Sequence, residues 1–531
     1  MPNARMSTSF AAVARPALLA LLIASPLVAQ GRPGGAPEQG RSPGAQAQGQ
    51  GRGAPGGAEV QGIRIIPDTA ITSTDVVTIR GRQVPYRVTV GTQPAYDDDN
   101  KPVAALFYTF YERTDVRDRS TRPLVISFNG GPGSASVWMH IAYTGPKLLR
   151  IDDEGYPLQP YGIQDNEHSI LDVADIVYVD PVNTGFSRII GDAKREQFFG
   201  VNEDIAYLAK WLDMFVGRHG RWTSPKYLIG ESYGTTRVAG LAGRLQGNHW
   251  MYLNGVVLVS PTGLGLEREG PVRAALYLPY YAATAWYHKA LAPDLQQRDL
   301  EQLLPEVEAF TIDQLIPAMT RGGSLPAERR RELARQYARY SGLDEDVVLQ
   351  HNMAIPTSFY WKELLRDQGL TVGRLDSRYR GLDRVDAGAS PDFDPALTSW
   401  NHAFAPAINH YLRDVLGFET DLQYWLFGPV HPWNRQGERT GLQLQQAMAQ
   451  NPYLHVMTQS GYFDGGTDYF NAKYNMWAMD PTGRFQDRLH FEGYRSGHMM
   501  YLRAEDLATS NDDIRAFIQR TTPQPGQPAR Q

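Results

Sequence analysis

The chain has 531 residues, of which 42% are hydrophobic and 21% charged, and this length suits one large domain with an insertion or two to three average domains. Its formal net charge of −5, without a long basic run, argues against a nucleic-acid partner or an anionic membrane surface. Because cysteine is absent, disulfides, thiolate nucleophiles and cysteine-ligated metals are excluded.

The first residues have the composition of an export signal. Arg5 and Arg15 precede the apolar run PALLALLIASPLVA, which ends in small side chains. The run is short for a membrane span, so we expect a signal peptide over residues 1–29, with an uncleaved membrane anchor as the alternative. The sequence therefore predicts an exported protein, periplasmic or secreted, without stable membrane insertion after cleavage.

Residues 30–60 and 521–531 are predicted to be a disordered linker and a disordered tail. Both are rich in Gly, Pro and Gln and carry almost no large apolar side chains, so they cannot bury enough surface to offset the entropy of ordering. The linker contains GRSPG, which matches the pattern Gly-x-Ser-x-Gly around Ser42. That pattern alone therefore cannot identify a nucleophile.

Short apolar runs alternate with helical patterns through the rest of the chain. The runs cover residues 123–128, 175–180, 226–230, 255–260 and 453–460. Apolar runs separated by helix-sized segments are typical of a parallel sheet covered on both faces. One such helix is expected over residues 202–220, with an apolar face at Ile205, Leu208, Trp211, Leu212 and Phe215. The fold class is α/β, with a central, mostly parallel sheet flanked by helices and formed by residues 61–262 and 401–520.

Residues 263–400 have a different pattern. No strand-like run occurs there, and PAERRRELARQYARYSG predicts a charged helix that ends at Gly342. We expect a helical cap insertion over the carboxyl ends of the strands, where ligands bind in α/β enzymes. A separate helical domain without a role at the site is the alternative.

Ser232 is the candidate nucleophile. It lies in GESYG, directly after the apolar run KYLI and directly before TTRVAGLAGRL, whose small residues suit a helix packed closely on a sheet. This strand, turn and helix context is what exposes a serine above a parallel sheet. Gly230 and Gly234 fit a sharp turn with the serine in a strained conformation. A structural Gly-Ser turn is the alternative.

A serine nucleophile needs a base and an orienting acid, which follow it in the order Ser, Asp, His in this kind of fold. Asp464 stands at the end of an expected strand and is favoured over Asp468, which is expected to start a helix or lie on the surface. His498 follows a flexible Ser-Gly and is favoured over His490, which lies in a strand-like run. The histidines have no metal-ligand spacing, so no metal is predicted.

The loop SFNGGPGSAS, residues 127–136, supplies glycine amides after an expected strand. In this kind of fold one oxyanion donor is the amide after the nucleophile, here Tyr233, and the other comes from such a loop, where Gly131 fits. A plain turn or a phosphate cradle is the alternative, although the chain lacks the Gly-Lys-Ser/Thr of a phosphate-binding loop.

Taken together, these motifs resemble the serine carboxypeptidase family of α/β-hydrolase peptidases, as a bacterial-type member without cysteines. The matching segments, in the family order, are Asn129–Gly133, Tyr178–Ser187, Gly230–Tyr233, Gly461–Asp464 and Gly497–Met499. An ordered set of this kind is far more specific than any single motif. The resemblance implies the α/β-hydrolase fold and a triad of Ser232, Asp464 and His498.

The resemblance also implies how the terminal carboxylate of a substrate is held. Asn129, Gly130 and Glu231 fall at the positions that bind it, but Tyr143 stands where the family has a second glutamate that shares a proton with Glu231. A phenol cannot form a shared-proton acid pair. We therefore expect Glu231 to face Tyr143, and activity to persist toward neutral pH.

The sequence thus predicts an exported serine carboxypeptidase that acts on peptides through an acyl-enzyme and needs no cofactor. One alternative keeps the triad in an esterase or acyltransferase. The other is an inactive binding module on the same scaffold. Side-chain preference and oligomeric state have no signal in the sequence.

Overall fold

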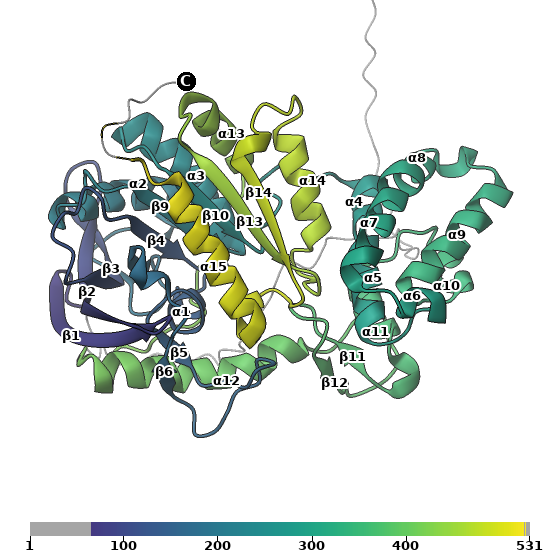
Figure 1. The fold of residues 1–531 in the computed structure, drawn as a ribbon, viewed down its shortest axis with the longest axis horizontal. Coiled ribbons are helices and arrows are strands. Elements are labelled where there is room, and N and C mark those ends of the chain that lie inside the picture. Colours follow the sequence, from purple (N-terminus) through teal and green to yellow (C-terminus); the bar gives the residue numbers. More distant parts are fainter. Residues whose placement is uncertain (1–64, 525, 527–531) are drawn as a thin grey trace, which may run out of the picture. The chain divides into compact units, whose positions relative to one another are not determined.

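The structure is a computed structural model that describes residues 65–524 and residue 526 (Figure 1). The predicted signal peptide and linker, and most of the predicted tail, lie outside the described residues. In the described part, no helix is both long enough and apolar enough to cross a membrane.

One large sheet organises the chain between residues 65 and 524. Its strand order is β1-β2-β3-β7-β4-β9-β10-β13-β14, with β8 paired to β3. The parallel strands are β4 (Leu124–Phe128), β7 (Asp175–Val179), β9 (Lys226–Glu231), β10 (Gly255–Val259), β13 (His455–Gly461) and β14 (Leu489–Tyr494). Each apolar run that predicted a strand forms one, and the α/β fold class is confirmed.

The antiparallel half of the sheet is not anticipated in the sequence analysis. It consists of β1 (Thr69–Ile79), β2 (Arg82–Tyr96), β3 (Pro102–Arg113) and the short β8 (Arg188–Ile189). A tight turn at Arg80 and Gly81 joins β1 to β2, and both residues have positive φ. Two small antiparallel pairs lie outside the large sheet: β5 (Lys147–Leu149) with β6 (Ile163–Asp165), and β11 (Thr371–Val372) with β12 (Arg380–Gly381).

Helices cover both faces of the large sheet, and the side chains of each strand alternate between the two faces. On one face, α2 (Val201–Arg218), α3 (Tyr233–His249) and α13 (Thr440–Gln450) pack on side chains such as Leu228 and Leu258. On the other, α1 (Val137–Ala142), α12 (Pro395–Asn409) and α15 (Ala504–Thr521) pack on Tyr227 and Val257. Figure 1 shows α15 and α3 on opposite sides of the sheet. The predicted apolar face of α2 is buried.

Most of the remaining helices lie between β10 and β13 in the chain. They are α4 (Gly270–Leu276), α5 (Leu278–Tyr287), α6 (Pro293–Gln296), α7 (Leu300–Phe310), α8 (Ile316–Met319), α9 (Ala327–Ser341), α10 (Glu345–Gln350) and α11 (Thr357–Glu363). Helix α9 ends at Gly342, which takes φ 72° as the predicted end of the helix requires. These helices enclose an apolar core of their own, and Leu276 and Ala283 also pack on Phe470 of α14 (Tyr469–Met479).

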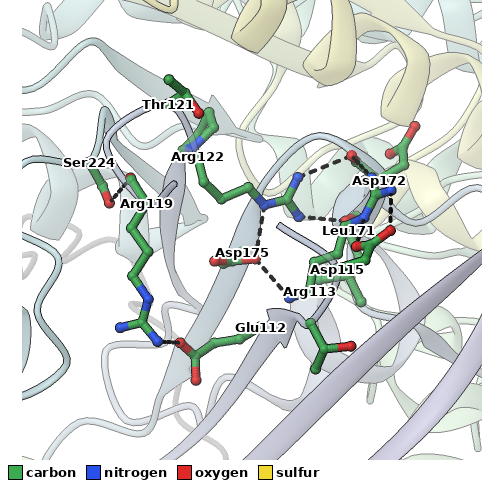
Figure 2. Close-up of polar contacts among 12 residues, drawn as sticks. Glu112, Arg113, Asp115, Arg119, Thr121, Arg122, Leu171, Asp172, Asp175 and Ser224 are labelled. Atoms are coloured by element: carbon green, nitrogen blue, oxygen red, sulfur yellow. Dashed lines mark hydrogen bonds and ion pairs between the residues drawn. The ribbon is translucent and has the colours of Figure 1, made fainter. Parts of the chain in front are cut away.

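A buried ion-pair network joins the amino-terminal ends of the parallel strands, and Figure 2 shows the part of it around Arg122 and Asp175. The Asp175 carboxylate accepts hydrogen bonds from Arg122 Nε at 3.0 Å and Arg221 Nη1 at 2.6 Å, and all three side chains are buried. Both guanidinium groups also donate to backbone carbonyls, so their charges are paired and hydrogen-bonded. This network ties β4, β7 and the segment before β9 together in a chain that has no disulfide.

Candidate active site

The carboxyl ends of β9, β10, β13 and β14 meet at one edge of the sheet, because these neighbouring strands run parallel. Ser232 directly follows β9, and its amide donates to Val259 O at 2.9 Å. Ser260 follows β10, and its hydroxyl donates to His498 O at 2.7 Å. The strands therefore bring the segments that carry Ser232, Asp464 and His498 to the same edge.

Ser232 adopts the strained backbone conformation that the sequence predicts, with φ 57° and ψ −126°. The two flanking glycines explain why the turn can form. A Cβ on Gly230 would lie 2.2 Å from Gly234 O, and a Cβ on Gly234 would lie 2.8 Å from Phe128 O. No side chain larger than hydrogen fits at either position. The amide after Ser232 opens α3, so the serine stands at the amino-terminal end of a helix.

Asp464 and His498 are hydrogen-bonded to each other. His498 Nδ1 lies 2.7 Å from Asp464 Oδ2, and both side chains are buried. The amides of Gly466 and Thr467 donate to Asp464 Oδ1 at 2.8 and 3.0 Å, and the Thr467 hydroxyl donates to Oδ2 at 2.7 Å. The carboxylate is therefore held on both oxygens and orients the imidazole.

The charges of this pair stabilise each other. Burial raises the pKa of Asp464, but the charge and hydrogen bond of His498 outweigh it and bring the pKa below its usual value. Burial lowers the pKa of His498, but the carboxylates of Asp464 and Glu231 outweigh it and bring the pKa above its usual value, while Arg374 acts in the opposite direction. An imidazole held in this way accepts a proton readily.

The two rival residues have other surroundings. Asp468 caps α14 and accepts from the amide of Asn471 at 2.9 Å, which makes it a helix start, although it is buried rather than on the surface. His490 lies in β14, where its ring stacks on His455 with centroids 5.7 Å apart. Neither contacts the pair formed by Asp464 and His498 through a hydrogen bond.

The hydroxyl of Ser232 makes no hydrogen bond within the described residues, and the residue is partly exposed. Catalytic hydrogen bonds are often long before substrate binds and tighten only in the complex. Ser232 is strained and accessible, and it lies at the same sheet edge as the imidazole of His498. Such a complex requires this arrangement.

The Gly-rich loop lies directly against the turn that holds Ser232. A Cβ on Gly130 would lie 2.4 Å from the amide nitrogen of Tyr233, so the backbones of loop and turn are in contact. Gly131 has φ 101°, a conformation that favours glycine. This contact brings the amides that the sequence assigns to the oxyanion site, those of Gly131 and Tyr233, into one region.

Glu231 is buried beside the nucleophile and has two hydrogen-bond partners. The Tyr501 hydroxyl donates to Oε1 at 2.8 Å, and Asn129 Nδ2 donates to Oε2. Asn129 is itself oriented by the amide of Met139, which donates to its side-chain oxygen at 3.0 Å. Burial raises the pKa of Glu231 to about 7, although His498 and Tyr501 lower it.

The expected pairing of Glu231 with Tyr143 is not formed. The Tyr143 hydroxyl instead donates to Gln459 Oε1 at 2.7 Å, and its ring stacks on that of Tyr501 with centroids 4.5 Å apart. Tyr501 takes the place against Glu231, because the turn after His498 carries it there. Its position three residues after the candidate base is the one sequence signal that could have pointed to it.

A second feature that sequence reasoning missed is the segment Arg374–Arg378, which follows β11. Its carbonyls accept hydrogen bonds from the backbone on both sides of the site: Arg374 O from Gly465 N at 2.9 Å, and Leu375 O from His498 N at 2.6 Å. Asp376 Oδ2 accepts from Gly497 N at 3.2 Å. This segment therefore connects the loop of Asp464 with the loop of His498. No periodic pattern marks it in the sequence.

No group of three or more His, Asp or Glu side chains arranged to hold a metal occurs in residues 65–524. The absence of a metal and of a cofactor in the reaction stays a prediction.

Comparison with known proteins finds a family match over part of the chain. Residues 93–290 match the family model described as serine carboxypeptidase. This range includes the Gly-rich loop and Ser232, but ends before Asp464 and His498. Serine carboxypeptidase-like 36 of Arabidopsis thaliana is 31% identical over 160 residues, which is 30% of this chain and 31% of that protein. Carboxypeptidase Y homolog A of Phaeosphaeria nodorum is 30% identical over 140 residues, 26% of this chain and 23% of that protein.

These alignments span less than a third of the length of either relative. A longer match is found in structure. Kex1(Δ)p, a prohormone-processing carboxypeptidase from Saccharomyces cerevisiae, superposes with a TM-score of 0.51 over 82% of this chain and 91% of that chain, at 13% identity. At this identity the likeness concerns the fold. The chain thus shares its fold with that carboxypeptidase and is similar to serine carboxypeptidases over residues 93–290, which include the Gly-rich loop and the Ser232 turn.

Proposed function

We propose that this protein is an exported serine carboxypeptidase that removes the C-terminal residue of peptides through an acyl-enzyme. The observation that carries the proposal is the 2.7 Å hydrogen bond between His498 and Asp464 at the sheet edge where Ser232 stands in a strained turn. Strain at a serine beside an oriented imidazole is typical of a nucleophile rather than of a structural turn.

In the proposed reaction Ser232 Oγ attacks the carbonyl carbon of the terminal peptide bond while His498 takes the hydroxyl proton. The amides of Gly131 and Tyr233 stabilise the negative oxygen that forms. The C–N bond then breaks as His498 gives the proton to the leaving amine. Water, deprotonated by the same imidazole, hydrolyses the ester and restores the serine.

The terminal carboxylate of the substrate is assigned to Asn129, Gly130 and Glu231. Because the pKa of Glu231 is raised to about 7, a protonated carboxyl is available at neutral pH and below to donate a hydrogen bond to an anionic group. A permanently charged glutamate beside the nucleophile would repel the same group. Tyr143 supports this region indirectly, through its stacking on Tyr501.

Replacement of the nucleophile tests the mechanism. Ser232→Ala is expected to lower kcat for a blocked dipeptide by several orders of magnitude, because no other group supplies the activated oxygen. Ser42→Ala provides a matched control, since Ser42 lies in the same Gly-x-Ser-x-Gly pattern within the predicted linker. If Ser232→Ala stayed within a few-fold of wild type, the mechanism would be wrong. If wild type failed to react with a fluorophosphonate, the alternative of an inactive binding module would be preferred.

One observation favours a second candidate, an esterase or acyltransferase that uses the same triad. The partners of Glu231 are a phenol and an amide rather than a second carboxylic acid. Hydrolysis rates of a peptide with a free terminal carboxylate and of its amide separate the two candidates. A carboxypeptidase prefers the free acid, whereas equal rates would support the second candidate.

Export is the part of the proposal that rests on the sequence alone. The apolar run after Arg15 and the small residues near position 29 support cleavage by a signal peptidase. Sequencing of the mature amino terminus after cell fractionation tests it, and retention of Met1 on a cytoplasmic product would contradict it.

A further inference from the structure

Arg374 is a positive charge beside the active site whose side chain has no hydrogen-bond partner among the described residues. Its backbone is fixed by Gly465 N, which donates to Arg374 O at 2.9 Å. Its Nη1 lies 3.8 Å from the position that a Cβ on Gly466 would occupy, and the Gly466 amide donates to Asp464. The guanidinium therefore lies against the loop that holds the catalytic acid, with 35% of the side chain exposed.

The neighbouring carboxylate of Asp394 forms a long ion pair with this guanidinium but accepts no hydrogen bond from it. Asp394 Oδ2 lies 3.8 Å from Arg374 Nε, which is beyond hydrogen-bond distance. The carboxylate already accepts hydrogen bonds from the backbone amides of Arg374, Leu375 and Ala396, at 3.1, 3.2 and 3.1 Å. Asp394 thus fixes the chain at the start of α12 and leaves the donors of the guanidinium unused.

The other charges around the triad are mostly negative. Glu231, Asp464 and Asp468 are all buried there, and the first two raise the pKa of His498. Arg374 is close enough to act on His498 in the opposite direction. An anionic group that enters this region meets the charged carboxylate of Asp464, and it also meets those of Glu231 and Asp468 once the pH rises above their raised pKa values of about 7, so a cation is needed to receive it.

We propose that the guanidinium of Arg374 binds a carboxylate of the peptide substrate, next to the bond that is cleaved. This inference rests on the proposed function and extends it to the choice of substrate. A planar fork of N–H donors matches a carboxylate in a bidentate manner, and such a charge-assisted pair is stronger than a neutral hydrogen bond. The carboxylate is either that of the C-terminus, which Arg374 would then bind together with Asn129, Gly130 and Glu231, or that of an acidic side chain beside the scissile bond.

Substrate pairs that differ by one charge test this proposal. One pair compares a blocked dipeptide with its C-terminal amide, and two further pairs compare Glu with Gln on either side of the scissile bond. In wild type, kcat/KM is expected to be higher for the substrate that carries the bound carboxylate than for the neutral substrate of the same pair. Arg374→Met is expected to lower that ratio about 10- to 100-fold, and Arg374→Lys is expected to retain part of it. The substrate pair whose kcat/KM ratio falls in Arg374→Met identifies which carboxylate the guanidinium binds.

Arg384→Met is the matched control. Arg384 lies in the same insertion, pairs with Asp392 at 3.0 Å and is 86% exposed, so its loss is expected to leave every ratio unchanged. Thermal unfolding of Arg374→Met checks that the fold is kept, since Asp394 loses its ion pair with Arg374 but keeps its three backbone donors. If Arg374→Met lowered the rates of charged and neutral substrates equally, or altered none of the ratios, the proposal would be overturned.

This outcome is distinguishable from a failure of the proposed function. Protection of Ser232 from fluorophosphonate labelling by N-acetylglutamate, compared with N-acetylglutamine amide, measures carboxylate binding without any peptide turnover. Loss of protection in Arg374→Met supports the proposal even if wild type cleaves no peptide. Equal protection of wild type and variant contradicts it even if wild type is an active carboxypeptidase.

Discussion

At the scale of single residues, the ionisation of Glu231 links structure to pH dependence. Its carboxyl is buried between Tyr501 and Asn129, and its pKa is raised to about 7. Below that pH the group is neutral and can donate to an anionic substrate, whereas above it the group is charged and repels one. On the acid side, the proposed role of His498 as the base requires it to lose its proton, and its pKa lies above the usual value. Activity is therefore expected near neutral pH.

The first prediction concerns KM. For peptides with a free terminal carboxylate, KM is expected to rise as the pH passes through about 7, while KM for the amides stays level. Tyr501→Phe removes a hydrogen bond that lowers the pKa of Glu231, so the rise should move to higher pH by about one unit.

Steady-state kinetics measured from about pH 5 to 9 check this prediction, because this range extends from ordinary carboxyl pKa values past that of imidazole. Tyr360→Phe is the control, since its hydroxyl donates to Tyr281 O inside the helical insertion. A KM profile that is the same for the free acid and the amide would count against a carboxylate-binding role for Glu231.

At the scale of elements, the segment Arg374–Arg378 connects the helical insertion to the catalytic loops. Asp376 accepts from Gly497 N and forms a buried ion pair with Arg378, whose Nη2 lies 2.7 Å from Oδ2. The Ser377 amide donates to Phe463 O at 2.9 Å. Since Gly497 directly precedes His498 and Phe463 directly precedes Asp464, movement of this segment would change the positions of both side chains.

The second prediction separates the role of the Gly497 bond from that of the ion pair. Asp376→Asn and Asp376→Leu both remove the charge opposite Arg378, but only Asn keeps an oxygen that can accept from Gly497. We expect kcat of the Leu variant to be about tenfold below that of the Asn variant, at similar KM. Equal kcat values in two variants of equal thermal stability would show that Asp376 does not position His498.

At the scale of the whole molecule, a chain without cysteine depends on buried polar networks and on packing. The pair of arginines on Asp175 lies at the amino-terminal ends of the parallel strands, opposite the edge that carries the site. Arg122 and Arg221 are almost fully buried, so each needs its counter-charge. This network can stabilise the fold without constraining the active site.

The third prediction follows from this separation. Asp175→Asn leaves two buried guanidinium groups without a carboxylate, and the free energy of unfolding is expected to fall by about 3–5 kcal/mol. The kcat of the folded variant should stay near that of wild type. Asp115→Asn, which removes an exposed pair with Arg113, should cost less than about 1 kcal/mol. Urea titration checks both values, and a loss of less than about 1 kcal/mol in Asp175→Asn would contradict the stabilising role.

Local patterns in the sequence predict much of the fold and of the candidate site. The apolar runs predict the parallel strands, and Gly342 predicts the end of α9, because burial periodicity and backbone conformation are properties of neighbouring residues. The Ser232 turn is predicted for the same reason, since its strand, its glycines and its helix are contiguous. The assigned roles of the site residues stay predictions until they are tested by substitution.

Contacts between distant segments are what the sequence does not specify. Tyr501 reaches Glu231 across 270 positions, so the expected contact between Glu231 and Tyr143 was wrong, whereas activity toward neutral pH stays a prediction. The place of Arg374 and Asp376 beside the catalytic loops likewise depends on how the insertion returns to the core. The sequence by itself determined the parallel strands and the strained turn at Ser232, because these depend on short-range periodicity and sterics. Only the tertiary structure decided which partners surround Glu231 and His498, because burial and charge there are contributed by segments far apart in the chain.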